Sequence, residues 1–176
     1  MSLRDREEFE RGRRGEQAVM TLLQRRGCFI VPCYDFAGTN GDKAPRLLGA
    51  ISRYAIPDLD VAKGGNRMWC EVKAKKKPTL HEISQVLEHG FAKRLFDGYA
   101  KVQAITGTSV TVWVVEVDSG DVIYRSLDKL GAPRVYPGDK MDKGGTIFWP
   151  RASFKFAINW RQDAELYDIM QPARAA

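Results

Sequence analysis

The spacing of hydrophobic positions divides the first part of the chain into a helix, a strand and a loop. Positions 9, 12, 16, 19 and 23 recur at helical spacing, which predicts a helix over residues 4–26 that ends at Gly27. Residues 28–34 are expected to form a strand, and residues 35–52, rich in Gly, Asn, Asp and Pro, a long loop. Glu16 lies on the apolar face of the helix, so its carboxylate should have a cationic partner or reach a polar cavity.

Two short segments in which apolar and charged residues alternate predict a β-hairpin. They cover residues 56–61 and 68–73, and a Gly-Gly-Asn sequence between them supplies the turn. Side chains two apart in a strand share a face, so Glu71 and Lys73 project together. Pairing of the two strands would bring Asp58 beside them.

The next segments predict a second helix and two strands. The helix is expected over residues 78–98, where Thr79 and Glu82 match an N-terminal capping box. The strands are expected at residues 100–105 and 110–117, and the second is apolar enough for the centre of a sheet.

Beyond residue 118 the pattern predicts short elements. Residues 122–130 read as a strand that runs into a short helix, and strands are also expected at 146–149 and 154–160. Residues 131–145 are expected to form a loop, and residues 161–176 a short helix and a frayed tail. The aromatic residues here, Trp149, Phe154 and Trp160, could stack on bases, but the alternation around them favours a place in the core.

Composition narrows the class of protein. The 176 residues fit one domain, and 44% hydrophobic with 28% charged residues is typical of soluble globular proteins. The chain has no apolar run of membrane-spanning length and no signal-peptide core, so we expect a cytoplasmic protein with no membrane partner. Cys28, Cys33 and Cys70 lack zinc-site spacing and are expected to be reduced thiols. No Gly-rich phosphate loop is present, so no nucleotide cofactor is expected.

Charge points to a polyanionic partner. The net charge is +6, and one basic cluster, Lys75, Lys76 and Lys77, directly follows the predicted hairpin. Two carboxylates and an ammonium group close together are costly to desolvate unless a cation binds there, and hard oxygen ligands suit Mg²⁺ or Mn²⁺. A lysine beside such a metal can orient water and offset charge on a phosphate, so the predicted chemistry is metal-assisted phosphodiester hydrolysis.

Pro57-Asp58 followed by Glu71-Val72-Lys73 resembles the motif of the PD-(D/E)xK nuclease superfamily. The pattern is most similar to Holliday-junction resolvase-like and VRR-type nuclease modules. The resemblance implies an α/β protein with a restriction-endonuclease-like core, a mixed β-sheet flanked by helices. That core is expected to span residues 1–118, with a β-rich C-terminal extension, residues 119–176, packed on the same domain.

The resemblance also implies roles for individual residues. The metal ligands it implies for Mg²⁺, or Mn²⁺ in its place, are Asp58, Glu71, the Val72 carbonyl and Glu16. It implies that Lys73 positions the attacking water and that Gln85, on the second helix, belongs to the catalytic set. Asp60 shares a strand face with Asp58, and the sequence leaves open an exchange of roles between the two.

DNA is the expected partner. The residues expected to contact it are Lys75, Lys76, Lys77, Arg53 and His81. The favoured function is a Mg²⁺-dependent endonuclease, structure-specific or non-sequence-specific, in recombination, repair or phage DNA processing. The alternatives are a non-catalytic nucleic-acid-binding module with the same fold and a structural protein whose ionic cluster is a salt-bridge network. The sequence does not select the substrate, and a homodimer remains an option because a resolvase must cut two strands.

Overall fold

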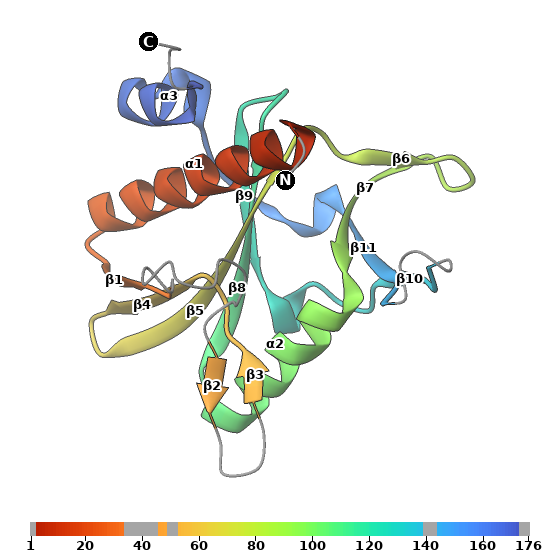
Figure 1. Ribbon diagram of the computed structural model, residues 1–176, viewed down its shortest axis with the longest axis horizontal. Helices are drawn as coiled ribbons and strands as arrows, with labels where there is room; N and C mark the ends of the chain where they lie inside the picture. The colour runs from red at the N-terminus through yellow and green to blue at the C-terminus, as the bar shows by residue number, and fades with distance from the viewer. Residues whose placement is uncertain (1–2, 34–45, 49–52, 139–143, 173–176) are drawn as a thin grey trace.

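The computed structural model describes residues 3–33, 46–48, 53–138 and 144–172 (Figure 1). The expected loop over residues 35–52 therefore lies largely outside the described residues. Within it, residues 46–48 form a short strand.

A six-stranded sheet forms the centre of the molecule. Its strands are β1 (Phe29–Pro32), β4 (Leu59–Lys63), β5 (Asn66–Lys75), β8 (Ser109–Glu116), β9 (Asp121–Ser126) and β12 (Lys155–Asn159), in the order β1-β4-β5-β8-β9-β12. Pairing is antiparallel except between β5 and β8, which run parallel, so the sheet is mixed. The predicted hairpin and the predicted central strand are both confirmed.

Three helices flank this sheet (Figure 1). They are α1 (Leu3–Arg25), α2 (Lys93–Thr106) and α3 (Ala164–Met170). α1 and α3 pack on the face that carries Cys70 and Val72, and α2 packs on the opposite face against Trp69 and Val112. The predicted α/β fold with a mixed sheet between helices is thus confirmed.

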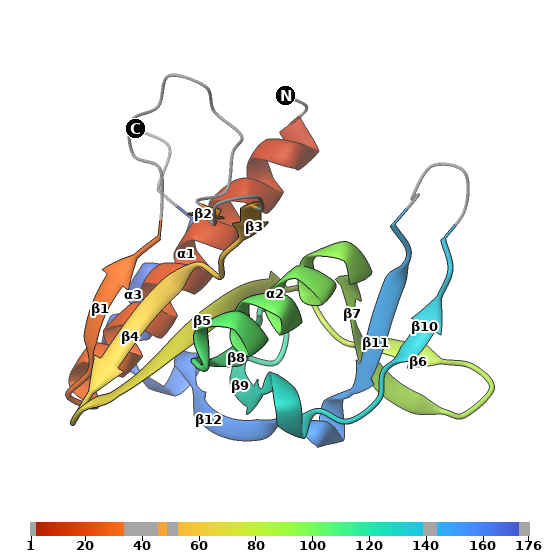
Figure 2. The same cartoon turned by 90° about the horizontal axis from the view of Figure 1, so that it is seen from below.

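Two smaller sheets complete the fold. One has the order β10-β11-β7-β6 and consists of β10 (Arg134–Tyr136), β11 (Thr146–Pro150), β7 (Val86–Ala92) and β6 (Thr79–His81). It stands beyond the end of β5 (Figure 2). The other pairs β2 (Arg46–Leu48) with β3 (Arg53–Ala55).

The prediction for residues 78–105 is wrong. The expected helix over 78–98 is instead β6, a turn, β7 and the start of α2, and the expected strand over 100–105 is the second half of α2. β7 pairs on one side with β11, a partner far along the chain that helical spacing cannot reveal. The α2 segment buries Phe96, Tyr99 and Val102 at helical spacing, and Gly107 ends the helix in the left-handed conformation with φ of 67°.

The C-terminal elements largely follow their prediction. β9 leads into a 3₁₀ helix (Leu127–Lys129), and β11, β12 and α3 form where strands and a helix were expected. β10 lies inside the expected loop over 131–145. Trp149, Phe154 and Trp160 are all buried, in agreement with the core interpretation.

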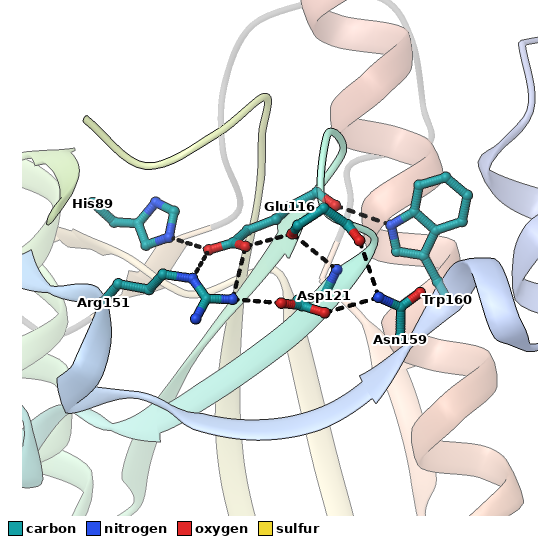
Figure 3. A network of polar contacts seen from close by, with 7 residues as sticks. His89, Glu116, Asp121, Arg151, Asn159 and Trp160 are labelled. Carbon is teal, nitrogen blue, oxygen red and sulfur yellow. Dashed lines mark hydrogen bonds and ion pairs between the residues drawn. The ribbon is translucent and has the colours of Figure 1, made fainter. Parts of the chain in front are cut away.

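A buried polar network joins the four-stranded sheet to the six-stranded sheet (Figure 3). Glu116, at the end of β8, accepts hydrogen bonds from His89 Nε2 on β7 at 2.8 Å, Arg151 Nε at 2.7 Å and Ser119 Oγ at 2.6 Å. Burial alone would raise the pKa of Glu116, but these donors outweigh it and lower the pKa to about 2. Arg151 also binds Asp121 on β9, at 2.5 Å. The network fixes the two sheets relative to each other.

Candidate active site

The hairpin places Asp58 where β4 gives way to irregular chain. β4 begins with Leu59 opposite Cys70 of β5, so the backbone of Val72 extends past the end of its partner strand. The Asp58 carboxylate takes the place of a strand there, because its Oδ2 accepts a hydrogen bond from the Val72 N–H at 2.8 Å. The carbonyl of a strand residue points to the same side as its N–H, so the Val72 carbonyl faces the Asp58 side as well.

Glu71 is the most unusual residue of the site. Its side chain is 0% exposed and forms an ion pair with Lys73, which lies on the same face of β5. Apart from Lys73 and the hydroxyl of Tyr99, the Glu71 carboxylate has no polar partner among the described residues. A buried carboxylate with free acceptor positions is costly, so this arrangement suits a ligand that binds oxygen.

Glu16 reaches the same site from α1. The helix crosses β5 at Gly15, where an added Cβ would lie 3.0 Å from the Ala74 Cβ, so glycine permits this close approach. Burial raises the pKa of Glu16 to about 7; the nearby Glu71 carboxylate adds to the rise, while Lys73 opposes it. The prediction that this carboxylate reaches a polar site is consistent with that environment.

Three carboxylates compete for one ammonium group in this site. Burial and the charge of Glu71 raise the pKa of Asp58 well above its usual value. Burial would lower the pKa of Lys73, but the charges of Glu71 and Asp58 outweigh burial and raise it. When these carboxylates are ionised they outnumber the ammonium group of Lys73, so a bound cation would favour their ionised forms.

The donor set fits a hydrated divalent cation. Asp58 and Glu71, together with the Val72 carbonyl, are oxygen donors, and Mg²⁺ characteristically binds one or two carboxylates while it retains several waters. Within the described part of the chain, no group of three or more carboxylate, imidazole or thiolate side chains is placed to hold a metal ion. Water or a phosphate oxygen would have to supply the remaining ligands.

Asp60 is engaged elsewhere. Its carboxylate accepts hydrogen bonds from Arg67 Nε at 2.7 Å and Arg67 Nη2 at 2.5 Å. This bidentate pair neutralises Asp60, whereas Asp58 has no such cation besides Lys73 in the residues described. The geometry favours Asp58 over Asp60 as the site carboxylate.

Gln85 and His81 do not join this site. Both belong to the β6–β7 hairpin rather than to a helix, and the shared helical face expected for them does not exist. Gln85 is exposed in the turn with φ of 54°, and the His81 Nδ1 lies 2.7 Å from Ser84 Oγ. In both views the turn projects away from the central sheet (Figures 1 and 2).

The basic run lies beside the site as expected. Lys75 is half-buried, with its Nζ 5.5 Å from the centre of the Phe91 ring, and Lys76 and Lys77 are exposed just after β5. Arg53 begins β3, but its side chain lies outside the described part of the structure.

Tyr99 is a site residue that the sequence did not reveal. It is buried on α2, where burial and the carboxylates of Glu71 and Asp58 raise its pKa, and its hydroxyl faces Glu71. The only sequence signal was the spacing of Phe96, Tyr99 and Val102, which becomes visible once this segment is assigned to a helix.

Comparisons with known proteins identify the fold. No protein-family model and no curated protein sequence matches the chain. Among solved structures, it is similar to Hjc, a Holliday junction resolvase from the archaeal hyperthermophile Archaeoglobus fulgidus, with a TM-score of 0.51 and 14% identity over 81% of this chain and 91% of that chain. A nuclease from a fusselovirus aligns with a TM-score of 0.43 and 11% identity over 89% of this chain and 90% of that chain. The likeness to Hjc shows a restriction-endonuclease-like fold, as predicted. In the residues described here, no helix is both long and apolar enough to cross a membrane.

Proposed function

We propose that this chain, which shares its fold with a Holliday junction resolvase, is a metal-dependent nuclease that hydrolyses phosphodiester bonds in DNA. The observation that carries the proposal is Glu71, a fully buried carboxylate that shares the single ammonium group of Lys73 with Asp58. An ionic network with a purely structural role would be expected to pair each buried carboxylate with its own cation.

Each residue of the site has a role in this proposal. Asp58 and Glu71 would hold Mg²⁺ or Mn²⁺ with the Val72 carbonyl, and Glu16 would bind the ion directly or through water. The bound ion would polarise the phosphate and lower the pKa of a bound water. Lys73 Nζ, held by Glu71, would orient the attacking water and offset the negative charge that develops on the phosphate oxygens.

The substrate in this proposal is the DNA backbone. Lys75 ends β5, and Lys76 and Lys77 follow it. These three side chains would bind phosphates on either side of the cut without reading sequence. The enzyme would act as a structure-specific or non-sequence-specific endonuclease in recombination, repair or phage DNA processing. Cleavage of both strands of a junction would require two copies of the chain, because each copy carries one such site.

A cleavage assay with matched variants tests the proposal. The substrates are supercoiled plasmid, linear duplex, single strand, a four-way junction, a flap and RNA, each with Mg²⁺, with Mn²⁺ and with EDTA. We expect metal-dependent cutting by the wild type and a loss of about a hundredfold or more in Asp58→Asn and Lys73→Met. Asp60→Asn is the matched control, because Asp60 is paired with Arg67, and it should retain cutting.

Two results would contradict the proposal. Binding of DNA with no cutting in either metal would support the non-catalytic binding module instead. Cutting that survives both Asp58→Asn and Lys73→Met would place the reaction outside this site.

A further inference from the structure

A pocket of about 310 Å³ lies against the four-stranded sheet, next to the end of β5. Its lining includes Lys75, Lys77, Thr79, Gly90 and Phe148. Lys75 follows Lys73 by two positions on β5, so the pocket adjoins the candidate active site along the same strand face.

Gly90 and Phe148 shape the floor of the pocket. They are opposite each other in the β7–β11 pair, and a Cβ added to Gly90 would lie 2.6 Å from the Phe148 ring. Because Gly90 has no Cβ, the Phe148 ring can occupy this space. The Arg134 guanidinium lies 4.3 Å from the centre of the same ring and also bonds Glu88, with Nε at 3.1 Å from Oε2. These contacts hold the ring in place and neutralise Glu88, the acidic residue of the pocket lining.

The two lysines make the pocket attractive to an anion. The Lys75 ammonium has no hydrogen-bond acceptor or ion-pair partner among the residues that the structure describes. Burial and the neighbouring cations Lys73 and Arg11 lower its pKa, against a smaller opposing effect of Glu8. Lys77 is exposed at the rim, and in the described part of the chain it too lacks an acidic partner. A phosphate bound between the two ammonium groups would relieve the repulsion around Lys75.

We propose that this pocket binds one unpaired nucleotide of the DNA strand that lies in the active site. Lys75 and Lys77 hold the phosphate, and the base packs against the ring of Phe148. The volume is at the low end of the ~300–1,000 Å³ of small-ligand pockets, which suits one nucleotide and excludes a base pair. The inference rests on the proposed nuclease function and narrows its substrate to DNA with an unpaired nucleotide next to the cut.

Binding without metal tests this inference separately from cutting. Fluorescence anisotropy in EDTA compares a short duplex that carries one unpaired nucleotide with the fully paired duplex of the same sequence. We expect the wild type to bind the unpaired form about tenfold more tightly, and Lys77→Gln and Phe148→Leu to lose most of that preference. A 2-aminopurine at the unpaired position should change its fluorescence on binding to the wild type and not to Phe148→Leu.

Control variants make the same changes elsewhere. Lys155→Gln and Phe156→Leu alter exposed side chains on β12, the far edge of the six-stranded sheet, and should keep the preference. Thermal melting checks that each variant is folded, and Lys77→Gln, at an exposed position, carries the test if Phe148→Leu unfolds.

Equal affinity of the wild type for both duplexes, or a preference unchanged in Lys77→Gln, would overturn the pocket assignment. The nuclease proposal would survive that result if Asp58→Asn still abolished cutting. If the wild type prefers the duplex with the unpaired nucleotide but cuts no DNA, the pocket assignment is supported and the nuclease proposal is rejected.

Discussion

Replacement of Glu16 by glutamine should stabilise the metal-free protein at neutral and alkaline pH. Burial and the Glu71 charge raise the pKa of Glu16 from 4.5 to about 7, so the folded state binds its proton more tightly than the unfolded state. The stability that this proton contributes is fully present below pH 4.5 and is lost as the pH rises to about 7. Above that pH the ionised carboxylate opposes folding.

The magnitude follows from the size of the shift. At 1.4 kcal/mol per pH unit, the change from 4.5 to about 7 corresponds to ~3 kcal/mol, and partial exposure of the side chain reduces this to ~2 kcal/mol. In Glu16→Gln that penalty disappears. The variant should therefore match the wild type near pH 4.5 and exceed its free energy of unfolding by ~2 kcal/mol at pH 8.

Urea denaturation in EDTA at a series of pH values measures this difference. Glu10→Gln is the matched control, because Glu10 is exposed on the same helix, and it should show no such pH dependence. A stability difference between Glu16→Gln and the wild type that is constant with pH would refute the reasoning. So would a variant that is less stable than the wild type at pH 8.

Three other perturbations probe the fold and the site. Gly15→Val should destabilise the protein by ~1–3 kcal/mol in urea denaturation and also lower DNA cutting, because the valine side chain would push α1 away from Ala74. An unchanged free energy of unfolding and unchanged cutting would argue against the close approach. Glu116→Ala should lower the free energy of unfolding by about 3 kcal/mol at pH 7, because three donors lose their acceptor. The loss should be much smaller near pH 2, because the contribution of Glu116, whose pKa is low, disappears as the pH falls from 4.5 to about 2; equal losses at both pH values would contradict this. Added Mg²⁺ should raise the melting temperature of the wild type but not of Asp58→Asn, and an equal rise in both would indicate binding elsewhere.

Local sequence was sufficient for the hairpin that carries the site. The alternation of residues and the Gly-Gly-Asn turn define β4 and β5 within a short span, and the side-chain period of two places Glu71 beside Lys73. Glu16 was also visible, because a carboxylate interrupts an otherwise apolar helical face. Each of these signals depends on residues close together in the chain.

The incorrect predictions concern segments whose pairing or packing partners are distant in sequence. Residues 79–81 and 86–92 form strands instead of a helix because β7 pairs with β11, whose residues follow more than fifty positions later, so the helix on which Gln85 had been placed does not form. The same error hid Tyr99, since its approach to Glu71 depends on the packing of α2 under β5. The pocket at Phe148 likewise arises from three segments that the sequence does not connect.

The two strands that pair with β5 lie at different distances from it in the sequence. β4 is adjacent in sequence, whereas β8 pairs with β5 at a separation of about forty residues. A chain that leaves the ribosome could thus form the hairpin early, but Glu71 would remain hydrated until α2 and β8 arrive to bury it. The proposed nuclease site would therefore be assembled only when this parallel pairing is complete.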